Sequence, residues 1–173
     1  MTVDPAFTFV LVGSGNIGGT YAKAIANLDG VALGGLVSRS GRRPDYLPIK
    51  AEVAASLSEL TKPYDAVILC TPNGTHHTQA QEAALLGKHV LTEKVLDITR
   101  GNINSMMRAC EDAGVTLAVT FQRRMSPDNA SMKRLLESGA LGKVFAADMR
   151  VKFYRDMDYY NSGDYRGGYA IDG

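Results

Sequence analysis

Short apolar runs alternate with amphipathic segments along most of the chain. The runs are nearly continuous in Val, Leu, Ile and Ala, which is typical of parallel strands covered on both faces. The segments between them carry apolar residues at helical spacing. The pattern predicts strands at 7–12, 31–37, 51–54, 65–70, 88–92 and 115–120, and helices through 21–26, 75–86 and 99–113. Such alternation predicts an α/β fold with a doubly wound parallel sheet and right-handed crossovers.

The turn between the first strand and the first helix reads G-x-G-x-x-G. Gly13 allows the tight turn, Gly15 allows the backbone to approach a pyrophosphate, and Gly18 allows the helix to pack on the strand. Asn16 and Ile17 complete the loop, and the first amides of the helix would face the phosphates. Glycine-rich turns also occur for structural reasons alone, but a strand before and a helix after favour nucleotide binding. The motif therefore predicts a Rossmann domain that binds a dinucleotide.

The end of the second predicted strand indicates which dinucleotide is bound. Domains that prefer NAD usually place Asp or Glu there, about 20 residues after the glycine motif, to accept from the ribose 2′-hydroxyl. Here the stretch 38–43 contains no carboxylate. Hydroxyl and guanidinium groups suit a 2′-phosphate, although a merely solvated basic loop is the alternative. The sequence therefore favours NADP over NAD, with Ser38, Arg39, Ser40 and Arg43 as the expected ligands.

Polar residues follow the fourth predicted strand at its carboxyl end, where open α/β sheets bind ligands. They are Thr71, Pro72 and Asn73, with His76 in the helix beyond. The same segment also fits a structural turn in which Thr75 caps the helix. A metal site at the two adjacent histidines is disfavoured, because neighbouring helical side chains diverge and no third ligand is evident.

A charged pair, Glu93 and Lys94, follows the fifth predicted strand, again at a carboxyl end. The pair is either a solvated ion pair or part of the ligand crevice. Its position makes Lys94 a candidate to contact a substrate oxygen. The sequence therefore predicts a crevice with polar residues from two neighbouring strand ends.

The pattern changes beyond residue 124. A helix is predicted over 126–137 and a long alternating strand over 143–154, which has no helical partner. A polar, aromatic and glycine-rich stretch follows at 159–169. We therefore predict a dinucleotide-binding domain at 1–124, followed at 125–173 by a crossing helix and the first part of a truncated α+β substrate domain.

Composition and charge exclude several other classes of protein. Lys and Arg total 19 against 18 Asp and Glu, a net charge of +1, which argues against a nucleic-acid partner. No apolar run is long enough to cross a membrane, and no signal-peptide pattern opens the chain, so a cytoplasmic location is the default. Cys70 and Cys110 lack metal or disulfide spacing and are expected to be reduced.

Several groups of residues together resemble one known family. They are the glycine motif, Thr71-Pro72-Asn73 followed by His76, and the run 87–94 that ends in Glu93-Lys94. The segment from Gln122 to Val144 resembles the same family's crossing from its cofactor domain to its substrate domain. The family is that of glucose-fructose oxidoreductase, inositol dehydrogenase and rhizopine-catabolism proteins (Gfo/Idh/MocA). The similarity covers nearly the whole chain.

The resemblance implies hydride transfer between nicotinamide and a carbon of a sugar, cyclitol or related polyol. It implies that Lys94 hydrogen-bonds the reacting hydroxyl and stabilises developing negative charge, while Glu93 orients this lysine or the nicotinamide ribose. The other residues expected to contact the cofactor near the nicotinamide are Thr71, Pro72, Asn73, His76 and Gln122. The chain is thus expected to be an NAD(P)-dependent dehydrogenase or reductase for CH–OH groups of small molecules, homo-oligomeric when full length.

The chain departs from the family pattern in two ways. Val95 stands where the family has proline after the lysine, which removes a fixed φ and disfavours a cis peptide by about 2.5–4 kcal/mol. The sequence also ends at Gly173, before the segment that carries the family's proton-transfer residues. We therefore expect an incomplete copy of the enzyme that is inactive alone. Two alternatives stay open: a nicotinamide-dependent glycosidase of the same family, and a non-catalytic NADP-binding module.

Overall fold

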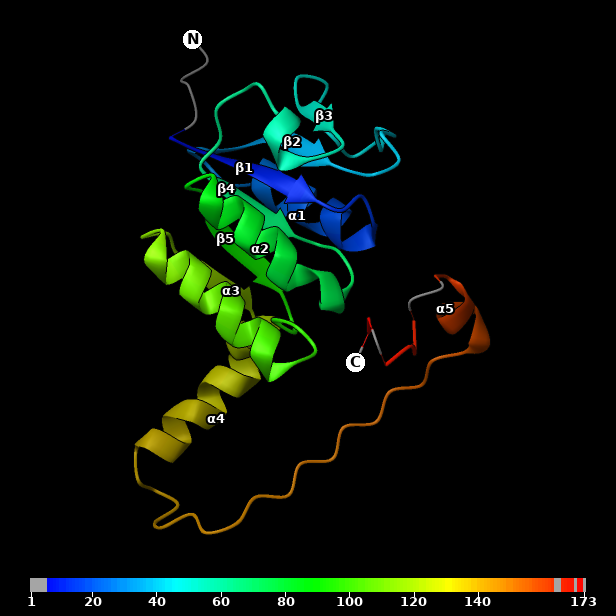
Figure 1. Cartoon of the computed structure of the whole chain (residues 1–173). Helices are drawn as coiled ribbons and strands as arrows, with labels where there is room; N and C mark the ends of the chain where they lie inside the picture. Colours follow the sequence, from blue (N-terminus) through cyan, green and yellow to red (C-terminus); the bar gives the residue numbers. More distant parts are fainter. Residues whose placement is uncertain (1–5, 164–165, 170, 173) are drawn as a thin grey trace. The chain divides into compact units, whose positions relative to one another are not determined.

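Six parallel strands form one sheet in the computed structural model, which describes residues 6–163, 166–169 and 171–172 (Figure 1). The strands are β1 Phe7–Val12, β2 Val31–Val37, β3 Glu52–Ala54, β4 Ala66–Leu69, β5 His89–Glu93 and β6 Leu117–Thr120. Their spatial order is β3-β2-β1-β4-β5-β6, so the strand order reverses between β1 and β4. Ligands of open α/β sheets bind at such a switch point. The predicted doubly wound Rossmann sheet is confirmed.

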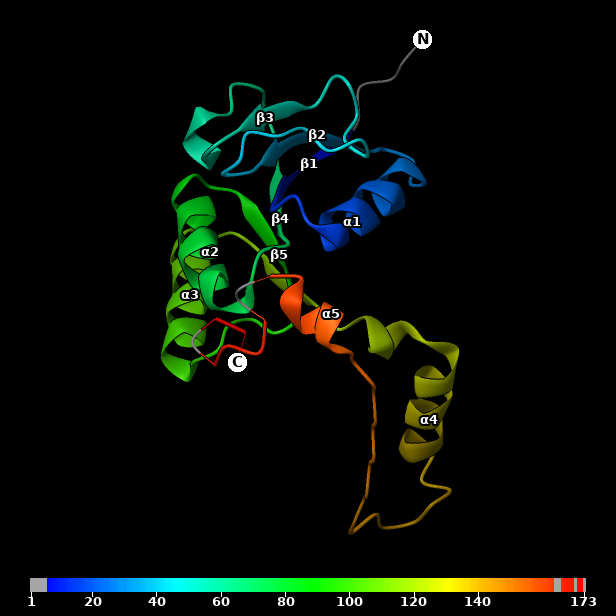
Figure 2. The ribbon, with the colours of Figure 1, turned by 90° about the vertical axis from the view of Figure 1, so that its right-hand side faces the viewer.

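Helices cover both faces of the sheet (Figures 1 and 2). On one face lies α1 Asn16–Ala26, and on the other lie α2 His76–Leu85 and α3 Arg100–Asp112. The remaining helical elements are the short turns η1 Leu57–Glu59, η2 Asn73–Thr75 and η3 Gln122–Met125, and the helices α4 Pro127–Glu137 and α5 Met157–Asn161. The helices of the sheet connect parallel strands, which is the connection that parallel pairing requires.

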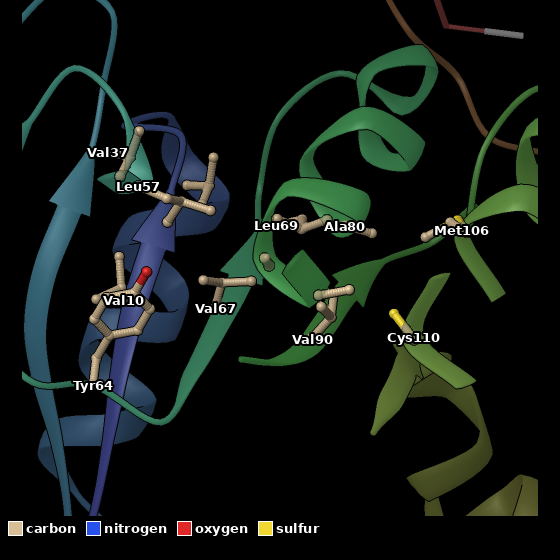
Figure 3. Packing of buried hydrophobic residues seen from close by; sticks show 13 residues of the cluster. Val10, Val37, Leu57, Tyr64, Val67, Leu69, Ala80, Val90, Met106 and Cys110 are labelled. Atoms are coloured by element: carbon tan, nitrogen blue, oxygen red, sulfur yellow. The ribbon is translucent and has the colours of Figure 1, made fainter. Parts of the chain in front are cut away.

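Alternate residues of the central strands point to opposite faces and build two separate cores. Val10, Val67 and Val90 are neighbours across β1, β4 and β5 on the α2–α3 face, and each is 2% exposed or less (Figure 3). Leu11 and Ile68 are neighbours on the α1 face. Burial of one such side chain contributes about 1.5–3 kcal/mol. Because both faces are buried, the strands show continuous apolar runs in the sequence.

The segment at 143–154 differs from its prediction. It is extended, but no strand pairs with it within the described chain, and all of its residues are exposed. Alternation marks a backbone suited to pairing, whereas a strand also needs hydrogen bonds from a neighbour. The prediction of a strand is therefore wrong for the described residues.

Backbone contacts divide the chain into two units. The first contains the described residues up to Thr120 together with those from Gly167 onward, and the second is Phe121–Arg166. The proposed domain boundary after residue 124 stays a prediction. Across the described residues, no helix combines the length and the apolar character needed to span a bilayer. Cys70 and Cys110 are both free thiols.

Candidate functional site

The three glycines of the G-x-G-x-x-G motif differ in what surrounds them, and Gly18 already lies within α1. Gly13 has a φ of +107°, and a Cβ atom there would lie 2.9 Å from the Cys70 carbonyl oxygen. A Cβ atom on Gly18 would lie 2.9 Å from the Gly13 carbonyl oxygen. Apart from its chain neighbours, nothing lies within 4 Å of a Cβ atom built on Gly15. The fold therefore requires Gly13 and Gly18, whereas Gly15 leaves open space beside the loop.

The N-terminus of α1 has no side chain that satisfies its first amides. Its N-cap residue is Gly15, no side-chain cap is made, and the first turn holds no acidic residue. Asn16 and Ile17 begin the helix. Unsatisfied amides at a helix N-terminus attract anions. The uncapped amides and the open space at Gly15 together fit the pyrophosphate of a dinucleotide.

Serine side chains join the end of β2 to the glycine loop. Ser38 is 7% exposed, and its hydroxyl donates to the Ser14 hydroxyl at 3.2 Å. The Ser40 hydroxyl lies 3.1 Å from that of Ser38. Arg39, between the two serines, is exposed. The structure thus gathers hydroxyls beside the exposed Arg39 where the 2′-phosphate contacts are predicted, and that assignment stays a prediction.

Arg43 is engaged within its own loop. Its guanidinium donates to the Pro48 carbonyl oxygen at 2.9 Å and also to the Ala51 carbonyl oxygen. These bonds hold the loop after β2 to the start of β3. Arg39 makes no such contact with the described residues, so it is the freer of the two arginines predicted to bind a phosphate.

The turn after β4, residues 71–75, is stabilised by hydrogen bonds from its own hydroxyl and amide groups. Thr75 donates its hydroxyl to the Pro72 carbonyl oxygen at 2.7 Å and makes no side-chain cap for α2. The interpretation of Thr75 as a capping side chain is therefore wrong, because its backbone angles (φ −108°, ψ −7°) are those of a helical turn and not the extended ones typical of an N-cap, and its hydroxyl accepts no amide of α2. Asn73 donates its side-chain amide to the Asp172 carbonyl oxygen at 2.8 Å, and the Gly74 amide donates to the Ile171 carbonyl oxygen at 2.8 Å. The end of the first unit thus lies on this turn.

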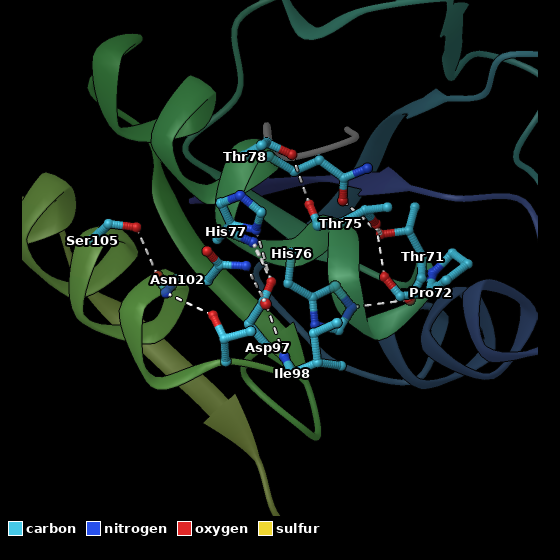
Figure 4. Close-up of polar contacts among 12 residues, drawn as sticks. Thr71, Pro72, Thr75, His76, His77, Thr78, Asp97, Ile98, Asn102 and Ser105 are labelled. Atoms are coloured by element: carbon cyan, nitrogen blue, oxygen red, sulfur yellow. Dashed lines mark hydrogen bonds and ion pairs between the residues drawn. The ribbon is translucent and has the colours of Figure 1, made fainter. Parts of the chain in front are cut away.

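His76 connects the ends of β4 and β5 from inside the protein. Its ring is fully buried, with Nδ1 2.9 Å from the Val95 carbonyl oxygen and Nε2 2.9 Å from the Thr71 carbonyl oxygen (Figure 4). Carbonyl oxygens only accept, so a neutral ring donates to one of the two. The resemblance implied that His76 lines the nicotinamide. The structure instead buries the ring, so its direct action is to hold two loops together.

The buried carboxylate of Asp97 accepts hydrogen bonds from His77, the residue after His76. The Asp97 side chain has no exposed surface, and its Oδ2 accepts from His77 Nδ1 at 2.9 Å and from the His77 amide at 3.2 Å. Its Oδ1 accepts from the Ile98 amide and from the Asn102 side chain, both at 2.8 Å (Figure 4). Asp97 therefore caps α2 from a distant part of the sequence and ties that helix to the loop after Lys94.

Replacement of Asp97 by asparagine is expected to destabilise the protein at neutral pH. Burial alone would raise the pKa of this carboxyl, but hydrogen bonds from Asn102, His77 and Ile98 outweigh burial and lower it. A lowered pKa means that the carboxylate stabilises the fold above the ordinary Asp range. This contribution is lost as the pH falls through the folded-state value. We expect Asp97→Asn to reduce the free energy of unfolding by about 1–3 kcal/mol at pH 7.

Chemical denaturation measured from neutral pH to about pH 3 tests this expectation. Asp97→Asn should also lose less stability than the wild type on acidification. Asp29→Asn, at an exposed position, is the matched control. Equal stability of the two variants at neutral pH would contradict the proposed contribution of Asp97.

Glu93 and Lys94 lie where β5 ends. Glu93 is half-buried and accepts from the Tyr21 hydroxyl at 2.8 Å, whereas Lys94 is exposed. The Lys94–Val95 peptide is cis, although Val95 stands where the resemblance expects proline. Burial, together with the Glu93 carboxylate, raises the pKa of the Cys70 thiol to about 12. The thiol therefore stays neutral beside this pair at physiological pH.

Sequence reasoning missed three residues of this region: Tyr21, His77 and Asp97. Tyr21 lies three residues after Gly18 in α1, near the buried face formed by Gly18, Ala22 and Ile25, and that spacing could have indicated it. Asp97 carries no comparable signal, because its side-chain donors, His77 and Asn102, come from α2 and α3. Gln122 lies in η3, within the second unit, so the first unit does not supply this predicted cofactor contact.

Comparison with known proteins identifies relatives that bind dinucleotides. The family model GFO_IDH_MocA, described as an oxidoreductase family with an NAD-binding Rossmann fold, matches residues 7–121. Inositol 2-dehydrogenase of Rhizobium meliloti (strain 1021) is 28% identical over 146 residues, which are 79% of this chain and 42% of that protein. The scyllo-inositol 2-dehydrogenase (NADP(+)) IolW of Bacillus subtilis (strain 168) is 32% identical over 107 residues, or 61% of this chain and 30% of that one.

A solved structure matches over the whole chain. The WlbA dehydrogenase of Bordetella pertussis in complex with NADH and UDP-GlcNAcA aligns with a TM-score of 0.89 and 31% identity, covering 100% of this chain and 51% of that one. The chain thus spans about half the length of these proteins. The family model covers well over half of the chain, in the same residues that form the sheet and the glycine loop. The chain belongs to the Gfo/Idh/MocA oxidoreductase family, with an NAD-binding Rossmann fold.

Proposed function

We propose that this protein is an NAD(P)-dependent oxidoreductase that moves a hydride between nicotinamide and a hydroxyl-bearing carbon of a sugar, cyclitol or related polyol. The observation that carries the proposal is the shared edge of β1, β4 and β5, which are neighbours in the sheet. The open space at Gly15 follows β1, and the exposed Lys94 follows β5. Carboxyl ends of parallel strands meet at one edge, so a dinucleotide bound there has a cation within its crevice.

The chemistry divides between the cofactor and the chain. Bound nicotinamide supplies the hydride donor or acceptor. The Lys94 ammonium hydrogen-bonds the oxygen on the reacting carbon and stabilises the negative charge that develops on that oxygen during hydride transfer. Glu93 orients this lysine or the nicotinamide ribose. The serines and Arg39 after β2 bind the adenosine end of the cofactor.

One observation favours a sugar carried on a nucleoside diphosphate as the substrate. The WlbA dehydrogenase solved with UDP-GlcNAcA aligns with 100% of the chain at a TM-score of 0.89, whereas the scyllo-inositol dehydrogenase of Lactobacillus casei aligns with 79% of it at a TM-score of 0.70. The structural match to the WlbA dehydrogenase therefore includes residues 125–173, where the substrate domain is predicted. UDP-linked sugar acids are therefore the first substrates to test, with inositols and free sugars for comparison.

Turnover assays on the longest natural form of the gene product test the proposed function. Net formation or loss of reduced nicotinamide with one of these substrates supports a dehydrogenase or reductase. Release of free sugar with no net change in the cofactor would identify a glycosidase instead. Cofactor binding with no turnover of any of them would favour a non-catalytic module.

We expect the chain to bind NADP more tightly than NAD. A charge-assisted hydrogen bond contributes about 1.5–3 kcal/mol, and solvent reduces this at an exposed side chain such as Arg39. Arg39→Ala should therefore weaken NADP binding about tenfold and leave NAD binding unchanged. Calorimetric titration with both cofactors measures the preference.

Arg43→Ala is the matched control for this prediction. Because the Arg43 guanidinium binds carbonyl oxygens of its own loop, its removal should lower the melting temperature while the preference for NADP remains. Equal affinities of the wild type for the two cofactors would refute the NADP assignment.

A further inference from the structure

The hydroxyl of Tyr21 lies between two strand ends. Tyr21 is a half-buried residue of α1, the helix that follows the glycine loop. Its oxygen lies 2.8 Å from Glu93 Oε1, where β5 ends, and 2.6 Å from Thr120 Oγ1, where β6 ends. One phenol therefore links the phosphate-binding helix to the ends of two neighbouring strands.

The direction of both hydrogen bonds follows from the groups themselves. An ionised carboxylate only accepts, so the Tyr21 hydroxyl donates its single hydrogen to Glu93. The phenol oxygen then has only lone pairs left for Thr120, so the Thr120 hydroxyl donates to it. The result is a directed chain from Thr120 through Tyr21 to Glu93. Hydrogen bonds aligned in this way polarise one another.

The surroundings keep the phenol protonated. Burial raises the pKa of Tyr21 well above its usual range, the hydrogen bond with Thr120 lowers it by less than burial raises it, and the Glu93 carboxylate raises it again. The phenol is thus a permanent donor at physiological pH. Within the described part of the chain, no other side chain donates a hydrogen bond to the Glu93 carboxylate.

We propose that Tyr21 is a positioning residue that acts through Glu93, fixing the carboxylate that orients Lys94 or the nicotinamide ribose. This inference rests on the proposed function for the identity of the ligand, but its geometry stands on the contacts of Tyr21 alone. The competing explanation is that the phenol merely packs between α1 and the sheet. A double-mutant cycle separates the two, because only a residue that acts through Glu93 loses its effect when Glu93 is absent.

The experiment compares Tyr21→Phe, Glu93→Ala and the double variant. Affinity for reduced cofactor is measured by fluorescence titration on the 173-residue chain, and thermal melting confirms that each variant is folded. We expect Tyr21→Phe to weaken binding about three- to tenfold in the wild-type background and to have no further effect in the Glu93→Ala background. Thr120→Val, which leaves the phenol without its donor, should give a smaller loss, about twofold.

Tyr64→Phe is the matched control, because it removes a buried phenol oxygen that has no hydrogen-bond partner among the described residues. Its cofactor affinity should equal that of the wild type. Unchanged affinity in Tyr21→Phe, or losses that add in the double variant, would overturn the proposal. The binding measurement needs no turnover, so absence of activity counts against the proposed function and leaves this test valid.

Discussion

Valine at position 15 is expected to abolish dinucleotide binding while the fold stays intact. A Cβ atom on Gly15 meets nothing within 4 Å apart from its chain neighbours, and the backbone there is extended, with a φ of −75°. The protein itself therefore tolerates a side chain, at the expense of about 1 kcal/mol for a poorer N-cap residue. The same side chain occupies the space that a pyrophosphate needs. Binding should weaken at least about 100-fold, which corresponds to about 2.7 kcal/mol.

Gly13→Ala gives the contrasting result. Gly13 has a φ of +107°, and its Cβ atom would lie 2.9 Å from the Cys70 carbonyl oxygen, so alanine there should lower the melting temperature whether or not cofactor is present. Calorimetric titration and thermal melting on both variants distinguish lost affinity from lost fold. If Gly15→Val retained wild-type affinity, the phosphate site would lie elsewhere.

Lys94→Ala is expected to depress turnover far more than cofactor affinity. Electrostatic stabilisation of developing charge by one donor is commonly worth about 10²–10³ in kcat, and the exposed Lys94 is the cation at the end of β5. Its ammonium has no partner among the described residues of the protein, so its removal should leave the melting temperature unchanged. Steady-state kinetics on the longest natural form of the gene product measure kcat.

The matched control is Lys23→Ala, at an exposed position in the last turn of α1. This variant should keep both kcat and cofactor affinity. A kcat for Lys94→Ala equal to that of the wild type would remove the lysine from the mechanism, even if the protein proved to be a dehydrogenase.

The strand prediction succeeds where burial on both faces decides the structure. Val67 and Ile68 face opposite cores, and each is 1% exposed or less. A run of apolar residues is the direct sequence signature of that environment. The strand prediction for 143–154 is wrong because alternation of apolar and polar residues indicates which side of a strand would be buried, but not whether a neighbouring strand pairs with it.

Helix capping is a second case in which the local sequence does not determine the contact that forms. Thr75 has the composition and position of a cap, yet it lies in the turn η2 with helical backbone angles, and its hydroxyl accepts no amide of α2. The group that caps α2 is Asp97, whose carboxylate accepts from the His77 amide 20 residues earlier in the sequence. Local propensity predicts which residues can cap, whereas the fold decides which one reaches the free amides.

The sequence by itself determined the α/β alternation, the glycine loop and the family, because these depend on burial patterns and on residues close together in the chain. The motif already assigned the tight turn to Gly13 and the close approach of a ligand to Gly15. The tertiary structure adds the physical reason, because a Cβ atom on Gly13 would meet the Cys70 carbonyl oxygen and one on Gly15 would meet open space.

Three contacts are seen only in the tertiary structure. The Arg43 guanidinium donates to a carbonyl oxygen of its own loop, and the buried His76 ring lies between the ends of two strands. The Tyr21 hydroxyl donates to Glu93, 72 residues away. The Tyr21–Glu93 contact joins a crossover helix to a strand end that is distant in sequence, and the contacts of Arg43 and His76 depend on how their loops fold, so no hydrophobic pattern records them.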